Sequence, residues 1–532
     1  MRSRTRLTFL MLGMGLVFAL PVWAQQPVPA SAKKPLNQVQ VVTLLAGQAP
    51  SHRVAMLVKL RGIDFEPQDD YLQEVRLAGG DDELITALKS AQVTKPVTAD
   101  PAAQARQAEL SRHVAHGVGL AKKEQYAEAE QEYRAALQLD SQNADLYMGL
   151  ANVLGQEKKW DDAESAVQEA LRLDPNNDQA HYNRGVALDE KGDRDGAIAE
   201  YREALRLNPN NDKAHHNLGA ALGEKGDLDG EIAQFREALR ANPNFDVTHL
   251  NLGIALGRKG DLDGAIAEYR ETLRLDPDLP EAHYNLGLAL TNKGDLDGAI
   301  MEYHEALRLN PSFDAAYVDL GAALTNKGDL NGAIAEYRAA QHLNPKNEAV
   351  HAGLGSALSS KGDLDGAISE YREALRLNPH DEAVHTGLGM ALFSKGDSGG
   401  AISEYREVLR LNPNNDWAHT ALGIALGKKG DVDAAIAEYR EALRLNPNND
   451  AAHANLGMAL FSKGDVGGAI AEYREALRLN PNLADAHNNL GVALERKGDW
   501  RGAREEYREA YTRDPNNATY KRNYQRLAML RE

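Results

Sequence analysis

The chain has 532 residues, of which 43% are hydrophobic and 26% are charged, a balance that excludes disorder along its whole length. Its formal net charge of −18 argues against a nucleic-acid-binding protein, because phosphate binding needs a basic surface. Cysteine is absent, which excludes disulfides, thiol catalysis and cysteine-ligated zinc or iron–sulfur sites.

The N-terminus has the pattern of a secretory signal peptide over residues 1–24. Three arginines precede a mostly apolar run, which a proline and the small-x-small triplet Val22-Trp23-Ala24 follow. We expect cleavage between Ala24 and Gln25, and export to the periplasm or out of the cell. The alternative is an uncleaved N-terminal anchor. No later stretch is long and apolar enough to span a membrane, so no membrane span is expected in the mature chain.

Residues 36–93 differ in pattern from the rest of the chain. Apolar side chains recur there at helical spacing, and Gly62 and the pair Gly79-Gly80 end two of the segments. The pattern predicts a small module of three or four short helices, either a docking unit or a cap for the rest of the chain. Residues 25–35 and 94–107 are expected to be linkers, the second because of its prolines and small residues.

The remainder repeats one pattern every 34 residues. A constant period of this length predicts a stacked array of about twelve units over residues 108–515, because a single unit cannot bury its own apolar stripe. The period is set by eleven prolines, at Pro175, Pro209, Pro243, Pro277, Pro311, Pro345, Pro379, Pro413, Pro447, Pro481 and Pro515.

Each unit has the pattern of a helical hairpin. In one unit Asp193 is placed to cap a second helix. The apolar residues that follow it, from Ala197 to Leu205, fall on one helical stripe, and Asn208-Pro209 ends the helix. The fold class is therefore expected to be all-α, a solenoid of helical hairpins preceded by the small helical module.

The spacing resembles that of the tetratricopeptide repeat (TPR) family. The family pattern W-x2-L-G-x2-Y…A-x3-F…P reads here as His249-x2-Leu252-Gly253-x2-Leu256, then Ala265-x3-Tyr269, then Pro277. The family's Trp is usually His in this chain, Glu231 replaces a small residue, and the first unit lacks its proline. The resemblance implies a right-handed superhelix and a C-terminal capping helix over residues 516–532.

The same resemblance implies where a ligand binds. In this family the first helix of each unit lines a concave groove that holds an extended peptide or a segment of another protein. One groove column is similar to the asparagine ladder in the repeat domain of O-linked N-acetylglucosamine transferase, whose amides hold a peptide backbone. The alternative is that these amides bond only to neighbouring helices or water. The column comprises Asn183, Asn217, Asn251, Asn285, Asp319, Asn455 and Asn489.

In the middle of the array the column carries small residues, and apolar side chains stand nearby. Trp417 occupies a position that is alanine in other units, and methionine adapts to varied apolar partners. The alternative is that the two phenylalanines pack between units as core. The candidate apolar ligand-binding residues are Met390, Phe393, Trp417, Met458 and Phe461.

A histidine recurs where the family has tryptophan, nine times from His181 to His487. A shared metal is not expected, because equivalent atoms of adjacent units are about 10 Å apart, whereas zinc ligands lie about 2.1 Å from the metal. The histidines are expected to fill the tryptophan position, and a pH effect on the array is expected because imidazoles titrate near neutrality.

No catalytic motif, cofactor site or metal site is expected, so the chain is predicted not to be an enzyme. The function that the pattern favours is an exported scaffold that binds a peptide or protein segment, and no nucleic-acid partner is expected. Two alternatives remain open: a periplasmic scaffold for polysaccharide export or assembly, and a non-catalytic subunit of an envelope enzyme complex.

Overall fold

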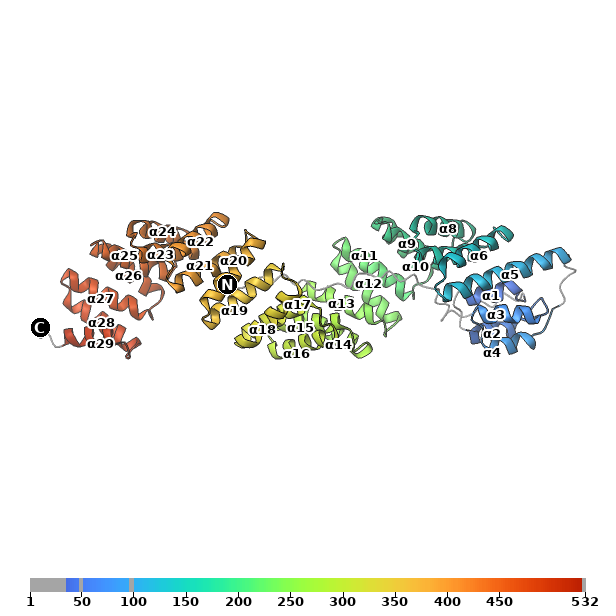
Figure 1. The fold of residues 1–532 in the computed structure, drawn as a ribbon, viewed down its shortest axis with the longest axis horizontal. Coiled ribbons are helices and arrows are strands. Elements are labelled where there is room, and N and C mark those ends of the chain that lie inside the picture. Colours follow the sequence, from blue (N-terminus) through green and yellow to red (C-terminus); the bar gives the residue numbers. More distant parts are fainter. Residues whose placement is uncertain (1–34, 47–50, 95–99, 529–532) are drawn as a thin grey trace. The chain divides into compact units, whose positions relative to one another are not determined.

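The computed structural model describes residues 35–46, 51–94 and 100–528. Throughout these ranges the regular elements are helices, which confirms the all-α class (Figure 1). Consecutive helices pack against one another from Pro101 to Lys293 and again from Leu296 to Ala528. None of the described helices has the length and apolar character needed to cross a membrane. The predicted signal peptide and its cleavage position at Ala24 and Gln25 lie outside the described residues.

The chain divides into two compact units after Gly294. The helices of the first unit are α1 (Gln38–Ala46), α2 (Ser51–Arg61), α3 (Asp69–Leu77), α4 (Asp82–Lys89), α5 (Pro101–Lys122), α6 (Tyr126–Leu139), α7 (Ala144–Gln156), α8 (Trp160–Leu173), α9 (Asp178–Glu190), α10 (Arg194–Leu207), α11 (Asp212–Glu224), α12 (Leu228–Ala241), α13 (Asp246–Lys259), α14 (Leu262–Leu275) and α15 (Pro280–Lys293).

The second unit begins at Asp295. Its helices are α16 (Leu296–Leu309), α17 (Asp314–Lys327), α18 (Leu330–Leu343), α19 (Glu348–Lys361), α20 (Leu364–Leu377), α21 (Glu382–Lys395), α22 (Ser398–Leu411), α23 (Asp416–Lys429), α24 (Val432–Leu445), α25 (Asp450–Ser462), α26 (Val466–Leu479), α27 (Ala484–Lys497), α28 (Trp500–Arg513) and α29 (Ala518–Ala528). From α5 to α28 the odd-numbered helices are called first helices and the even-numbered ones second helices.

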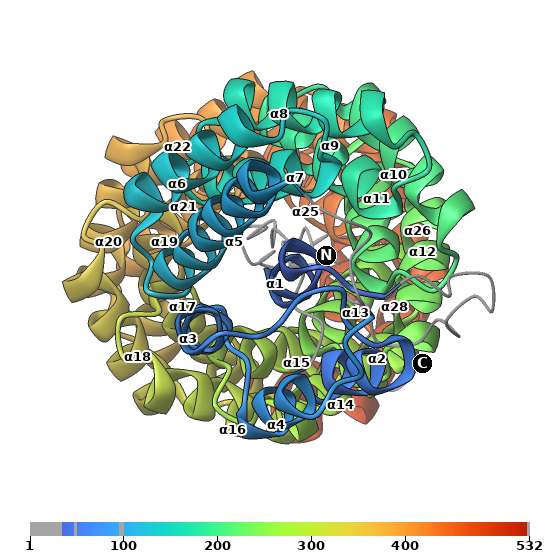
Figure 2. The ribbon, with the colours of Figure 1, turned by 90° about the vertical axis from the view of Figure 1, so that its right-hand side faces the viewer.

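The N-terminal module consists of helices α1 to α4, and it packs on the array rather than standing apart. Two isolated parallel bridges join its chain at Leu36, Ile63 and Val93. Helices α1 and α3 both contact α5, and Figure 2 shows them beside it. One hydrophobic cluster runs without interruption from Leu36 in this module to Ala180 in α9. The module therefore covers the apolar side of the first helical pair.

The predicted linker over residues 94–107 is wrong in its second half, because α5 begins at Pro101. The side chain of Asp100 accepts a hydrogen bond from the amide of Ala102 at 3.1 Å. Proline is favoured at the first position of a helix, where its missing N–H costs nothing. Pro101, which in the sequence pattern indicated a linker, is therefore the first residue of a helix.

Within each pair, a glycine of the first helix lies against an aromatic ring of the second. A Cβ on Gly423 would lie 2.5 Å from Cε1 of Tyr439, closer than any real contact allows. Tyr439 is buried, and burial of such a side chain contributes roughly 1.5–3 kcal/mol. The absence of a side chain at Gly423 therefore sets how closely the two helices approach.

The turn between the two helices is equally regular. Gly396 ends α21 with a φ of 95°, a left-handed conformation that glycine adopts without strain. Asp397 then caps α22, because its carboxylate accepts a hydrogen bond from the amide of Gly400 at 2.9 Å. Helix α29 continues the packing after the last pair, with Tyr520 and Leu527 buried against its neighbours.

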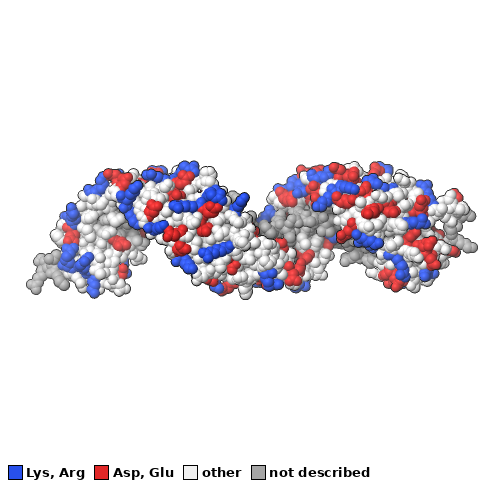
Figure 3. Space-filling view, viewed as in Figure 1, with Lys and Arg blue, Asp and Glu red and all other residues white. Residues whose placement is uncertain are grey.

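Charged side chains of both signs are interspersed over the surface, as Figure 3 shows. Many are paired locally: Arg444 contacts Glu441 three residues earlier at 2.6 Å. Others join consecutive repeats, as Lys259 does with Asp229 at 2.6 Å. These pairs are exposed, so each is expected to add at most about 1 kcal/mol to stability.

Glu231, the charged residue at a position that is small in other units, is almost completely buried in α12. Arg258 of α13 donates to its carboxylate at 2.9 Å. Gly223 of α11 provides the space, because a Cβ there would lie 2.4 Å from the carboxyl carbon of Glu231. Burial raises the pKa of Glu231, and the nearby Arg258 opposes that rise. Gly223 therefore provides the space, and Arg258 the opposite charge, for the buried carboxylate of Glu231.

This ion pair predicts an asymmetric response to mutation. Arg258→Ala should lower the free energy of unfolding by about 3 kcal/mol, because it leaves a buried carboxylate without its partner. Glu231→Ala should cost little, because alanine is the residue of other units and Arg258 is partly exposed to solvent. Urea unfolding of both variants measures the difference, with exposed Arg270→Ala as a control. Equal losses in the two variants would contradict this account.

Candidate functional site

The first helices α21, α23 and α25 carry a set of apolar side chains on consecutive repeats of the second unit. Met390 and Met458 are 50% and 52% exposed, and they are the large hydrophobic side chains left exposed on the described first helices of the array. Phe393, Ile424 and Phe461 are partly buried on the same helices. These five residues are called the apolar patch.

Two of the aromatic residues near the patch have defined partners. The ammonium of Lys428 lies 4.4 Å from the ring centroid of Phe393, a cation–π arrangement. Trp417, which is partly buried, meets Tyr405 of α22 edge-on, with ring centroids 5.9 Å apart and an interplanar angle of 84°. Trp417 therefore packs on the preceding repeat, and a minor part of its surface remains exposed.

Two of the column's asparagines in the first unit bond to neighbouring helices. The amide of Asn183 donates to Asn152 at 2.6 Å, and that of Asn217 donates to the hydroxyl of Tyr182 at 3.1 Å. Asn251 and Asn285, at the same position of the next two repeats, are also buried. For Asn183 and Asn217 the contacts are those of the alternative interpretation, in which the amides join adjacent first helices.

The members of the column in the second unit are more accessible. Asp319, Asn455 and Asn489 are each partly exposed. The amide nitrogen of Asn455 donates to the carbonyl of Ala451 one turn earlier, at 2.8 Å. Its carbonyl oxygen therefore remains a candidate acceptor for a bound backbone. The backbone-binding role of the column stays a prediction, and these are its strongest members.

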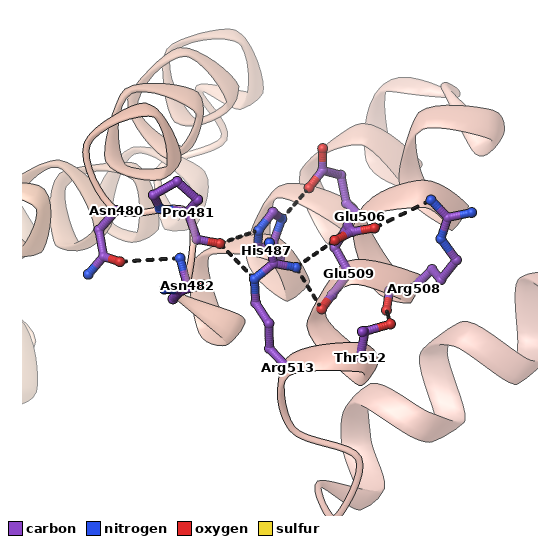
Figure 4. Close-up of polar contacts among 9 residues, drawn as sticks. All are labelled: Asn480, Pro481, Asn482, His487, Glu506, Arg508, Glu509, Thr512 and Arg513. Atoms are coloured by element: carbon purple, nitrogen blue, oxygen red, sulfur yellow. Dashed lines mark hydrogen bonds and ion pairs between the residues drawn. The ribbon is translucent and has the colours of Figure 1, made fainter.

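The histidines join three elements at each repeat. In the last pair, Nδ1 of His487 lies 2.6 Å from Glu506 of α28, and Nε2 lies 3.1 Å from the carbonyl oxygen of Pro481 in the preceding turn (Figure 4). The same two contacts, to a glutamate and to a proline carbonyl, recur at His181, His249, His351, His385, His419 and His453.

Both partners of each of these imidazoles are hydrogen-bond acceptors. An imidazole donates from both nitrogens only when it is protonated, so at His181 and His249 the geometry favours the charged form. The hydrogen bond to Glu200 raises the pKa of His181, although burial opposes it. Burial lowers the pKa of His249, but hydrogen bonds to Glu268 and to the carbonyl of Pro243 outweigh it, so the net shift is upward.

Metal binding has no geometric basis in the part of the chain that the structure describes. It contains no group of three or more histidine, aspartate or glutamate side chains placed to hold an ion. The histidines instead form separate hydrogen-bond contacts, each with the second helix of its own repeat and with the preceding turn. The sequence pattern identified the histidine column but not these partners, because the glutamate lies 19 residues away and the proline carbonyl belongs to the preceding turn.

Comparison with known proteins settles the family. Models of the TPR repeat and the tetratricopeptide repeat match the chain over 114–244, 258–348 and 355–517, in overlapping segments. The chain belongs to the tetratricopeptide repeat family. The individual matches are 258–294, 355–396, 389–430, 428–464 and 457–498 for the TPR repeat, and 114–178, 149–212, 182–244, 302–348, 280–313 and 484–517 for the tetratricopeptide repeat.

Solved structures of other TPR proteins are similar over parts of the chain. The APC/C hetero-tetramer Cut9-Hcn1 is 17% identical, with 79% of this chain and 96% of that chain covered and a TM-score of 0.40. YrrB, described as a TPR protein with an unusual peptide-binding site, is 24% identical, with 36% and 97% covered and a TM-score of 0.31. MamA is 28% identical, with 31% and 98% covered and a TM-score of 0.29.

No curated protein matches the chain. The TPR repeats themselves indicate a scaffold for protein–protein interaction, since TPR domains bind proteins or peptides. The TPR scaffold is typically non-catalytic.

The histidine contacts predict that this TPR array loses stability as pH rises. A raised folded-state pKa stabilises the fold fully below the unfolded value near 6.5, and that contribution disappears as pH rises through the folded pKa. The free energy of unfolding should therefore fall between pH 6 and pH 8.5. Glu268→Gln should make this fall smaller by a few tenths to about 1 kcal/mol. Urea unfolding at a series of pH values measures it.

The chain offers a matched reverse variant. His215 faces the neutral Gln234, at 2.8 Å, in the position where the other repeats with this histidine have glutamate. Gln234→Glu should therefore increase the pH dependence that Glu268→Gln reduces. His181 is the other histidine with a raised pKa. Glu200 and Glu203 are the charged groups that face it, and Arg184 forms an ion pair with Glu200. A pH profile that neither variant changes would refute the assignment.

Proposed function

We propose that this TPR protein is an exported, non-catalytic scaffold that binds an extended segment of a partner protein across the apolar patch. The observation that carries the proposal is the exposure of Met390 and Met458 on first helices whose other large hydrophobic side chains are covered. Leaving two methionines half exposed costs solubility, so their presence on one row of helices favours a binding role.

The character of the patch suits a chain segment rather than a small molecule. It extends over three consecutive repeats, and an elongated row of contacts matches an elongated ligand. Methionine is unbranched and polarizable, so it adapts to apolar side chains of several shapes. Trp417, which keeps part of its ring accessible, adds an aromatic anchor of the kind that dominates interface energies.

The polar neighbours support an extended backbone in the same place. Asn455 lies on α25 one turn before Met458, and Asn489 follows at the same position of α27. An asparagine offers both a donor and an acceptor, so these two amides are proposed to hold the ligand's peptide groups without reading its sequence. Export rests on the signal-peptide pattern of residues 1–24, which places the partner in the periplasm or outside the cell.

Removing the two methionines should weaken partner capture. We expect Met390→Ser/Met458→Ser to weaken binding about tenfold or more, since both side chains are exposed and their loss leaves the core intact. The measurement is affinity purification from envelope extract, with the bound material identified as protein or glycan and its affinity then determined. Met301→Ser, which removes a 67% exposed methionine from second helix α16, is the matched control.

Each result has a distinct meaning. A protein lost by the double variant but kept by the control supports the proposal. A partner kept by both variants contradicts the assignment of the patch. A glycan that depends on the methionines would replace a protein partner with the polysaccharide alternative.

The export proposal predicts a processed chain. Expressed in a bacterium with two membranes, the protein should be released from the periplasm with Gln25 as its first residue, because Val22-Trp23-Ala24 fits the cleavage rule. N-terminal sequencing or intact mass of the fractionated protein measures this. A chain that retains residues 1–24 in the membrane fraction would favour the anchor instead.

A further inference from the structure

The apolar patch is built from a motif that occurs twice. Residues 389–397 and 457–465 have the same nine-residue sequence, Gly-Met-Ala-Leu-Phe-Ser-Lys-Gly-Asp, 68 residues or two repeats apart. The repeat between them has Ile424, Gly427 and Lys428 at the corresponding positions. The patch therefore has two equivalent apolar ends and a different centre.

The centre contributes the charge. On each of α21, α23 and α25 one stripe is formed by residues at i, i+4, i+7 and i+8, which share a helical face. Among the twelve residues of these stripes only Lys428 is ionisable. The stripes are Thr386, Met390, Phe393 and Ser394; Thr420, Ile424, Gly427 and Lys428; and Ala454, Met458, Phe461 and Ser462.

Lys428 contacts a ring, whereas several lysines of the array contact a carboxylate. Lysines such as Lys259 and Lys293 pair with an aspartate of the preceding repeat. Within the described part of the chain no carboxylate lies within ion-pair distance of Lys428, whose ammonium rests on the Phe393 ring instead. An ammonium has three donors, and a ring face occupies only one side of it. An acidic protein of charge −18 thus presents a positive charge at the centre of an apolar surface.

The spacing of the two ends sets the length of a ligand. Equivalent atoms of adjacent repeats are about 10 Å apart, so Met390 and Met458 are about 20 Å apart. An extended chain advances about 3.3 Å per residue, so about six residues span this distance. Side chains six residues apart lie on the same side of an extended chain, as do those two and four residues along.

We infer that the patch selects an extended segment of a partner protein with two apolar side chains six residues apart and a carboxylate between them. The apolar side chains contact the Met390–Phe393 and Met458–Phe461 ends, and an aspartate or glutamate two or four residues after the first meets Lys428. This selection rests on the proposed function, which requires only that the patch bind a protein segment.

The test is selection of random nonapeptides displayed on phage against the purified full chain. Peptides enriched on the wild-type protein should carry two apolar residues six apart with an acidic residue between them. Lys428→Ala should remove the acidic preference and keep the apolar one. Lys429→Ala, which removes the same charge from the adjacent residue at the end of α23, should keep both preferences.

A direct measurement uses the selected peptides. Fluorescence anisotropy of the most enriched peptide should give a dissociation constant about fivefold lower than that of its amide counterpart, in which Asn or Gln replaces the acidic residue. The two peptides should bind Lys428→Ala equally, and added salt should reduce the wild-type difference, since a partly exposed ion pair is screened.

The outcomes distinguish failure of this inference from failure of the proposed function. Apolar enrichment without an acidic preference, or an acidic preference that survives Lys428→Ala, overturns the selection by Lys428 and leaves the patch as a binding face. Enrichment of the same peptides on Met390→Ser/Met458→Ser as on the wild-type protein, or no enrichment on either, overturns both.

Discussion

The structure depends on the close approach of two helices at a glycine. Gly423 and Tyr439 represent a contact that recurs in most repeats: the ring of the second helix fills the space that a side chain on the first would occupy. Dispersion and apolar burial both favour so close a fit. Because this contact and the glycine turn recur, most repeats share one hairpin geometry.

Polar groups then join one repeat to the next. The imidazole of His487 touches the second helix of its own repeat and the turn that precedes it, so one side chain holds three segments. Such groups are partly buried, and their partners must be satisfied for the contact to stabilise the fold. Repeat proteins gain stability approximately by addition along the array, so contacts of this kind in successive repeats add to one another.

Departures from the repeat pattern are where the chain becomes specific. Glu231 is accommodated by a glycine and an arginine of neighbouring helices, which provide the space and the opposite charge. Met390 and Met458 have no such internal compensation, since half of each side chain stays in solvent. The first kind of departure is explained by packing, whereas the second is explained by a partner.

The sequence by itself determined the 34-residue period, the helical hairpin, the caps and the TPR family, because these follow from local spacing of apolar residues, glycine and proline. It also identified the methionines and phenylalanines of the proposed site. Only the tertiary structure decided that α5 begins at Pro101, that Asn183 and Asn217 bond to neighbouring helices, and that Lys428 stands over Phe393. The start of α5 depends on local signals, an aspartate cap and a proline, that also occur in turns. The contacts of Asn183, Asn217 and Lys428 depend on a side chain about one repeat away, about which local spacing carries no information.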